Sequence, residues 1–376
     1  MLQIFFATGL VMACCVTAIA QEAVAPVAAN GGRDVASQEV KKSATVISGY
    51  ADMYYRFNFA KPGKSASYNN LTSFTNSHNS FALGMASLKL EHTAGRMNVV
   101  ADLGFGTRAE EFAYNDKGSL LAAVKQLYIS YAVSDWLKFT AGTWATHVGY
   151  EVLDPALNRN YSMSYMFTNG PFSHTGVKAE ISKGRHGFML GISNATDYRV
   201  VPDDKVNRKF IIAQYSIEVN ENVKMYLNFV GGKDPDTVKS AQIDFVATAK
   251  ISELFSIGFN ATYNSTRLWD GIKKENATAK KWWGTAIYLS LDPKPWYGIS
   301  LRGEYFDDKD QLKMYRDIPG GGSVFAATLS ANFKVDRFTF IPEFRLDRGS
   351  EELFVDSHQN VAKSSAGILM AAIYNF

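Results

Sequence analysis

The feature that most constrains the fold is an alternation of apolar and polar residues with period two, which recurs from residue 44 to the C-terminus. In FAATLSANF, for example, Phe325 and Leu329 fall on one side, and Thr328 and Asn332 on the other. Successive side chains of a β-strand point to opposite faces, so this pattern predicts strands and not helices. The predicted strands begin near residues 46, 81, 97, 123, 136, 174, 187, 209, 222, 239, 253, 280, 296, 323, 337 and 363, which makes sixteen.

The connections between these segments alternate between short and long. Tight turns such as VSDW and KVDRF are each followed, one strand later, by a long polar segment. The long segments lie near residues 60–80, 107–121, 152–173, 195–207, 231–238, 266–279, 307–322 and 347–362. In a membrane β-barrel, tight turns gather at the periplasmic end and long loops at the extracellular end. The prolines that follow residue 43 fall in connections except Pro342, which weakens its strand or marks a local bulge.

The chemistry of the two strand faces separates a membrane barrel from a soluble one. Charged residues recur on the polar faces, whereas the apolar faces are almost free of charge over roughly ten residues, the length that crosses a bilayer at barrel tilt. Aromatic residues such as Trp136, Tyr297 and Phe338 gather near strand ends, as in interfacial girdles. Lipid cannot satisfy an open sheet edge, so the first and last strands are expected to pair. The fold class predicted is therefore all-β, a transmembrane antiparallel β-barrel of about sixteen strands (about 14–18 are possible) with an aqueous lumen.

The N-terminal segment predicts export. Residues 1–20 are predicted to be a signal peptide, with an apolar h-region at 4–17 and a small-residue cleavage site at Ala18-Ile19-Ala20. The segment lacks a positive n-region, and an uncleaved anchor or a lipobox ending at Cys14 are the alternatives. Residues 21–43 are small and polar and predict a flexible periplasmic leader before a barrel domain at 44–376. Both cysteines lie in the signal peptide, so we expect no disulfide or thiol chemistry in the mature chain.

Motifs for catalysis or cofactor binding are weak. The six histidines show no metal-ligand spacing on one strand face, so no metal or other cofactor is expected. His78 and Ser80 resemble the base and nucleophile of the outer-membrane phospholipase, but no Asn motif that would orient the histidine is found. The triplet 320–322 lacks the Lys-Ser/Thr of a phosphate loop. A formal charge of +3 gives no indication of nucleic acid. The sequence therefore does not predict an enzyme.

Charged residues on the polar faces are the candidate lining of the lumen. Alternating signs, as in Arg302 and Glu304, either cross-link the barrel wall or create a field that orients solutes. Because basic and acidic residues nearly balance on this face, we expect weak ion selectivity. The candidate lining residues are Asp52, Arg56, Asp102, Lys138, Lys178, Glu180, Lys224, Asp244, Arg302, Glu304, Glu343 and Arg345.

Several segments resemble the OmpL-like beta-barrel porins (beta-barrel porin-2) of Gram-negative outer membranes. They are SGYADMYYRFNFAKP, TSFTNSHNSFALGMASLKLEH, KQLYISYAVSDWLKFTAGTWATHVGYE, YSMSYMFTNGPFSHTGVKAEI and the terminal AAIYNF. The resemblance implies an outer-membrane porin, a passive diffusion channel for small hydrophilic solutes that is surrounded by lipid and lipopolysaccharide. It also implies that the C-terminal Phe376 is the insertion signal for the barrel-assembly machinery. A plugged structural or adaptor barrel of an envelope complex is the alternative, and the oligomeric state stays open.

The third long connection is expected to narrow the lumen. In other porins the equivalent loop folds inward, and here it spans residues 150–172 and is rich in Tyr, Asn and Met. An ordinary surface loop is the alternative. The candidate constriction residues are Glu151, Asp154, Asn158, Arg159, Asn160 and Tyr161.

The last strand has an unusual inner face. Residues of one parity, which end in Tyr374 and Phe376, would face lipid. Leu369, Ala371 and Ile373, of the other parity, are less polar than a lumen face should be. We therefore expect this second apolar face to pack against the leader or against a loop inside the lumen.

Overall fold

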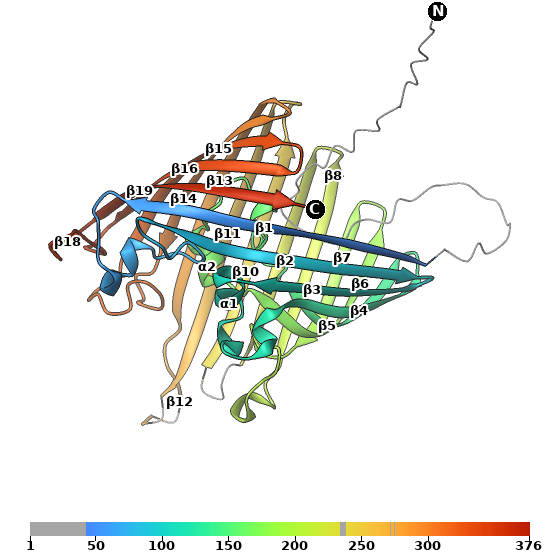
Figure 1. The fold of residues 1–376 in the computed structure, drawn as a ribbon. Coiled ribbons are helices and arrows are strands. Elements are labelled where there is room, and N and C mark those ends of the chain that lie inside the picture. Colours follow the sequence, from blue (N-terminus) through green and yellow to red (C-terminus); the bar gives the residue numbers. More distant parts are fainter. Residues whose placement is uncertain (1–42, 234–237, 271, 274) are drawn as a thin grey trace, which may run out of the picture.

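The computed structural model describes residues 43–233, 238–270, 272–273 and 275–376. The predicted signal peptide and residues 21–42 of the leader lie outside this part of the chain. Within it, sixteen long antiparallel strands and the two-residue β12 (Glu275–Asn276) form one sheet (Figure 1). The long strands are β1 (Ala44–Asn58), β2 (Ser80–Ala94), β3 (Met97–Phe105), β4 (Val124–Ser134), β5 (Leu137–Ala145), β6 (Ser173–Lys183), β7 (His186–Ser193), β8 (Phe210–Asn220), β9 (Val223–Lys233), β10 (Val238–Lys250), β11 (Phe255–Asp270), β13 (Lys280–Lys294), β14 (Tyr297–Asp307), β15 (Ser323–Val335), β16 (Phe338–Gly349) and β19 (Ser364–Asn375).

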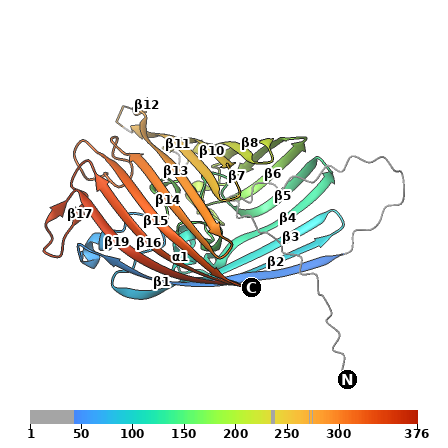
Figure 2. The same cartoon turned by 90° about the horizontal axis from the view of Figure 1, so that it is seen from above.

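The sheet closes on itself between the first and last strands. β1 pairs with β2 on one side and with β19 on the other, where Tyr50 lies opposite Asn375 and Asn58 opposite Gly367. The two strands run side by side in both views (Figures 1 and 2). Phe376 extends the pairing, because its N–H donates to the Gly49 carbonyl at 2.9 Å. The predicted closure is confirmed, and each long strand has two neighbours, as lipid requires.

The predicted strand starts agree with the observed ones to within two residues, and the number of long strands is sixteen as predicted. The sequence allowed a local bulge at Pro342, and this alternative is wrong. The pairings Ser330–Glu343 and Phe333–Phe340 keep one register on both sides of Pro342, and Pro342 itself lies opposite Met370. The ladder between β15 and β16 is only interrupted at this point, because proline has no N–H to donate.

The apolar face of the strands is the outside of the barrel. On β15, Phe325 and Leu329 are about half exposed, whereas Thr328 and Ser330 between and beside them are fully buried. A soluble barrel would show the reverse, with apolar side chains buried in its core. The alternation in the sequence is therefore that of a barrel with a lipid-facing surface and a polar interior.

Short helices occur only in the long connections of the described chain. They are the α-helices α1 (Thr107–Phe112) and α2 (Tyr165–Asn169) and the 3₁₀ helices η1 (Lys64–Asn69), η2 (Tyr114–Asp116), η3 (Leu120–Ala123), η4 (Pro155–Leu157) and η5 (Asp203–Lys205). A hairpin of β17 (Phe354–Val355) and β18 (Val361–Ala362) lies in the last connection. In the described ranges no helix is long and apolar enough to cross a membrane.

Candidate functional site

The connection between β5 and β6, residues 146–172, lies against the inner wall of the barrel; we call it the lumen loop. Its backbone donates to carboxylates that point inward from two strands. The Tyr161 N–H donates to Glu343 of β16 at 2.8 Å, and the Tyr165 N–H donates to Glu304 of β14 at 2.8 Å. The Tyr161 hydroxyl donates to the carboxylate of Asp52 on β1. Hydrogen bonds to carboxylates are stronger than neutral ones, so these contacts hold the loop on the wall.

Two arginines of the wall, the fully buried Arg302 and the largely covered Arg345, donate hydrogen bonds to the same segment. Arg302 Nη1 lies 2.5 Å from Glu151 Oε1 and donates to the Ser162 carbonyl at 2.7 Å. Arg345 Nη1 donates to the Met163 carbonyl at 2.7 Å. The guanidinium fork satisfies several acceptors at once, which is why arginine suits such a position.

The first part of the lumen loop is bound to other strands. The Gly149 N–H donates to Asp244 of β10 at 3.0 Å, and His147 Nε2 lies 3.1 Å from the Phe229 carbonyl of β9. Asp154 pairs with Lys125 of β4 at 2.7 Å. The lumen loop thus contacts strands on different sides of the barrel and crosses the interior between them.

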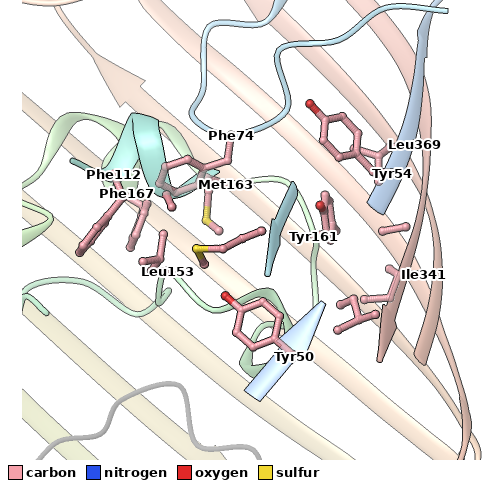
Figure 3. Packing of buried hydrophobic residues seen from close by; sticks show 14 of the residues in the cluster. Tyr50, Tyr54, Phe74, Phe112, Leu153, Tyr161, Met163, Phe167, Ile341 and Leu369 are labelled. Carbon is pink, nitrogen blue, oxygen red and sulfur yellow. The ribbon is translucent and has the colours of Figure 1, made fainter. Parts of the chain in front are cut away.

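Apolar packing reinforces this attachment (Figure 3). Leu153, Tyr161 and Met163 of the lumen loop belong to one buried cluster with Leu369 and Ile373 of the last strand. The sequence predicted that the apolar inner face of β19 packs against the leader or against a loop inside the lumen, and a loop covers it. Other residues of the cluster include Tyr50 and Tyr54 of β1 and, from two further connections, Phe74 and Phe112.

Arg108 of α1 is a site residue that the sequence analysis did not identify. It is fully buried, and its guanidinium lies 4.9 Å from the ring centre of Phe74 and 4.8 Å from that of Tyr161. It also donates to the Leu153 carbonyl at 3.2 Å. It therefore joins three long connections inside the barrel. Its only signal in the sequence is a positive charge in a loop, which is not distinctive.

The predicted lining residues all belong to the inward-facing set of their strands, but their environments differ. Seven are buried: Asp52, Asp102, Glu180, Asp244, Arg302, Glu304 and Glu343. Arg345 is nearly covered by the lumen loop, and Arg56 donates to the carbonyls of Tyr68 and Ser77. Lys138, Lys178 and Lys224 keep part of their side chains exposed, at 40%, 17% and 24%. That these residues line a conducting path stays a prediction.

The six predicted constriction residues are engaged with the wall or with the loop itself. Glu151, Asp154 and Tyr161 bind wall residues as described above. Arg159 pairs with Asp292 of β13 at 2.5 Å, and Asn160 Nδ2 donates to Ser330 Oγ at 2.7 Å. Asn158 bonds both backbone groups of Val152, so its role is to shape the loop. Their constriction role stays a prediction.

Burial sets the protonation of three groups in the lumen loop. It raises the pKa of the Tyr161 and Tyr165 hydroxyls well above the usual value, so both remain neutral donors. It lowers the pKa of His147 to about 4, with Lys178 nearby adding to the effect. His147 is therefore neutral at pH 7.

The His78 and Ser80 pair does not have the arrangement of a nucleophile and its base. His78 Nδ1 accepts the Asn58 N–H at 3.1 Å, and its ring stacks on Phe57 and Tyr68. In the part of the chain that the structure describes, His78 and Ser80 form no hydrogen bond with each other. The described residues also contain no group of three or more His, Cys, Asp or Glu that could hold a metal ion.

Comparison with known proteins gives a family and a fold. A family model described as "Putative beta-barrel porin-2, OmpL-like" matches residues 45–376. Similar solved structures include an anion-selective porin from Comamonas acidovorans, with 10% identity, a TM-score of 0.60, and coverage of 89% of this chain and 100% of that one. OmpT of Vibrio cholerae has 10% identity and a TM-score of 0.56, with coverage of 90% and 100%.

The outer membrane channel DcaP of Acinetobacter baumannii has 11% identity and a TM-score of 0.55, with coverage of 89% of this chain and 97% of that one. At such low identities these likenesses establish the fold alone. No curated protein matches the sequence.

Proposed function

The chain belongs to the OmpL-like beta-barrel porin-2 family, and we propose that it is a passive diffusion channel for small hydrophilic solutes with weak ion selectivity. The family and the outer-membrane neighbours indicate the outer membrane of a Gram-negative bacterium, where lipid and lipopolysaccharide surround the barrel. The same family and fold point to a channel rather than to an enzyme.

The observation that carries the proposal is the polarity of the inner wall. Inward-facing lysines on β5 and β9, Lys138 and Lys224, remain partly exposed to water inside a barrel whose outer face is apolar. No bond has to be made or broken for a solute to pass such a wall. Passage is then governed by the free width beside the lumen loop and by the wall charges.

The direct test is the conductance of the refolded protein in a planar lipid bilayer. We expect discrete current steps whose size rises with salt concentration. Incorporation of folded barrels without any current step would contradict the channel proposal.

A plugged barrel that serves an envelope complex is the second candidate, and one observation favours it. The lumen loop covers the wall of β14 and β15 so closely that Arg302, Thr328 and Ser330 are fully inaccessible. Such a barrel would conduct no ions and would co-purify with envelope proteins from its native membrane.

A barrel phospholipase is the least supported alternative, because His78 is bonded to the backbone of Asn58. Hydrolysis of lipid by the unaltered protein, together with its loss in Ser80→Ala, would support the phospholipase alternative.

Two further parts of the proposal concern biogenesis. Cleavage after Ala20 would give a mature N-terminus at Gln21, which mass spectrometry of the native protein can test. The second is recognition of Phe376 by the barrel-assembly machinery.

A further inference from the structure

The lumen loop covers several acidic residues of the wall, together with Arg302, and leaves lysines on β5, β6 and β9 partly accessible. Glu304 and Glu343 accept backbone N–H groups of the loop, and Asp52 accepts the Tyr161 hydroxyl. All three carboxylates are buried by these contacts. Solutes inside the barrel therefore do not meet this acidic side of the wall directly.

Three inward lysines that keep part of their side chains accessible lie on one arc of the wall, on β5, β6 and β9. Lys138 and Lys178 both pair with the single buried carboxylate of Glu180, at 3.0 and 3.1 Å. Two cations against one carboxylate leave a net positive charge on this arc. Lys224 pairs with Glu218 at 2.6 Å, which balances that position. On β2, Lys89 and Glu91 lie 3.8 Å apart and likewise balance each other.

We propose that Lys138 and Lys178 set an anion preference for the solute path, which runs along this arc of the wall. The inference rests on the proposed diffusion channel and gives its weak selectivity a sign. A single charge about 7 Å from a passing ion in water changes the ion's energy by about one thermal unit. Without salt screening, this changes the local concentration of that ion by a factor of about two to three. Charges farther away than the Debye length of about 8–10 Å are largely screened, so the nearest exposed charges dominate.

The experiment measures the reversal potential of the full-length protein in a planar bilayer across a KCl gradient. We expect chloride to be more permeant than potassium. Lys138→Gln should lower the chloride-to-potassium permeability ratio by about twofold to threefold. The lost positive charge favours chloride and disfavours potassium, each by about half a thermal unit once salt screening is included. Lys138 is the most exposed of the three lysines, so this variant keeps the packing of the wall.

The ion pair of Lys224 with Glu218 supplies matched controls. Lys224→Gln and Glu218→Gln break the same pair, so their structural effects are alike, but they change the wall charge in opposite directions. The first should lower the chloride-to-potassium ratio and the second should raise it. Lys363→Gln, in the connection after β16, should change neither ratio nor conductance.

The outcomes separate the two proposals. A potassium preference in the unaltered protein, or shifts of the same sign in Lys224→Gln and Glu218→Gln, overturns the anion preference while the channel stands. A complete lack of current from folded barrels overturns the channel and the preference together.

Discussion

Arg302 of β14 and Glu151 of the lumen loop form an ion pair inside the barrel, with Nη1 and Oε1 2.5 Å apart and both side chains shielded from water. The same guanidinium donates to the Ser162 carbonyl at 2.7 Å and to Thr328 Oγ1 at 3.1 Å. One wall residue therefore holds the loop at two points that lie far apart along it. The lumen loop is a fixed part of the interior.

Glu151→Gln should destabilise the folded barrel and loosen the lumen loop. Removing one partner of a buried ion pair costs up to about 3–5 kcal/mol, because the remaining charge is left without compensation. Glu304, 3.6 Å from Arg302, reduces that cost. The free energy of unfolding in urea measures the loss, and the noise of the open channel reports the mobility of the loop.

Glu91→Gln is the matched control for this change. Glu91 lies 3.8 Å from Lys89 in a partly exposed position, where an ion pair is worth about 1 kcal/mol or less. Equal losses in the two variants would mean that the Arg302 pair does not hold the loop.

The barrel itself could be predicted from the sequence because every strand repeats the same physical signal. Lipid on one face and water or polar groups on the other impose strict alternation, as in Phe325 to Asn332, and the tight turns fix where strands end. Closure between β1 and β19 follows from the cost of unpaired backbone groups in lipid. These rules depend only on neighbouring residues and on the bilayer.

The contacts of the lumen loop could not be predicted in this way. Glu343 and the Tyr161 N–H that it accepts are 182 residues apart, and nothing in either segment identifies its partner. The apolar inner face of β19 was the one feature of the sequence that indicated such a contact. Leu369 and Ile373 are apolar side chains on the lumen side, so they were expected to pack against another segment. Arg108 gave none, because a buried arginine and a surface arginine look alike in a sequence.

Acidification should loosen the base of the lumen loop through His147. Its folded-state pKa of about 4 is below the usual value of about 6.5, so the neutral form stabilises the loop above pH 6.5. That contribution declines as the pH falls from about 6.5 to 4, because only the detached loop gains the proton. The loss is at most about 3.5 kcal/mol, at about 1.4 kcal/mol for each pKa unit.

The measurement is the frequency of closures or noise bursts of the channel between pH 7 and pH 4. His147→Gln cannot take up a proton and should remove this part of the pH dependence. The ring of His174 lies 5.1 Å from that of His147, and Lys178 is near both, so the charges of these two groups also act on His147. An unchanged pH profile in His147→Gln would contradict the assignment.

Deletion of Phe376 should impair assembly in cells more than folding in detergent. Phe376 adds two backbone hydrogen bonds with Gly49, at 2.9 and 3.1 Å, to a ladder that already runs from Tyr50 to Asn58. Its ring is half exposed on the outer surface and contributes little to the closure itself. We expect a several-fold lower amount of heat-modifiable barrel in outer membranes and a nearly unchanged refolding yield in detergent. Equal losses in both assays would make Phe376 a structural residue rather than an insertion signal.

Replacing residues 155–168 of the lumen loop with a short Gly-Ser linker should change conductance and selectivity together. Conductance should rise because the interior becomes wider. Asp52, Glu304, Glu343 and Asp347 would lose the loop groups that now bind them and would face water. The chloride-to-potassium permeability ratio should therefore decrease.

Shortening the connection that carries β17 and β18 is the control for a general effect of loop deletion, and it should alter neither quantity. Heat-modifiable migration verifies that both variants are folded, because the deletion uncovers apolar residues of β19. Unchanged conductance after replacement of 155–168 would remove the lumen loop from the pore. A wider pore with an unchanged ion preference would mean that the covered carboxylates do not determine selectivity, even when they are exposed.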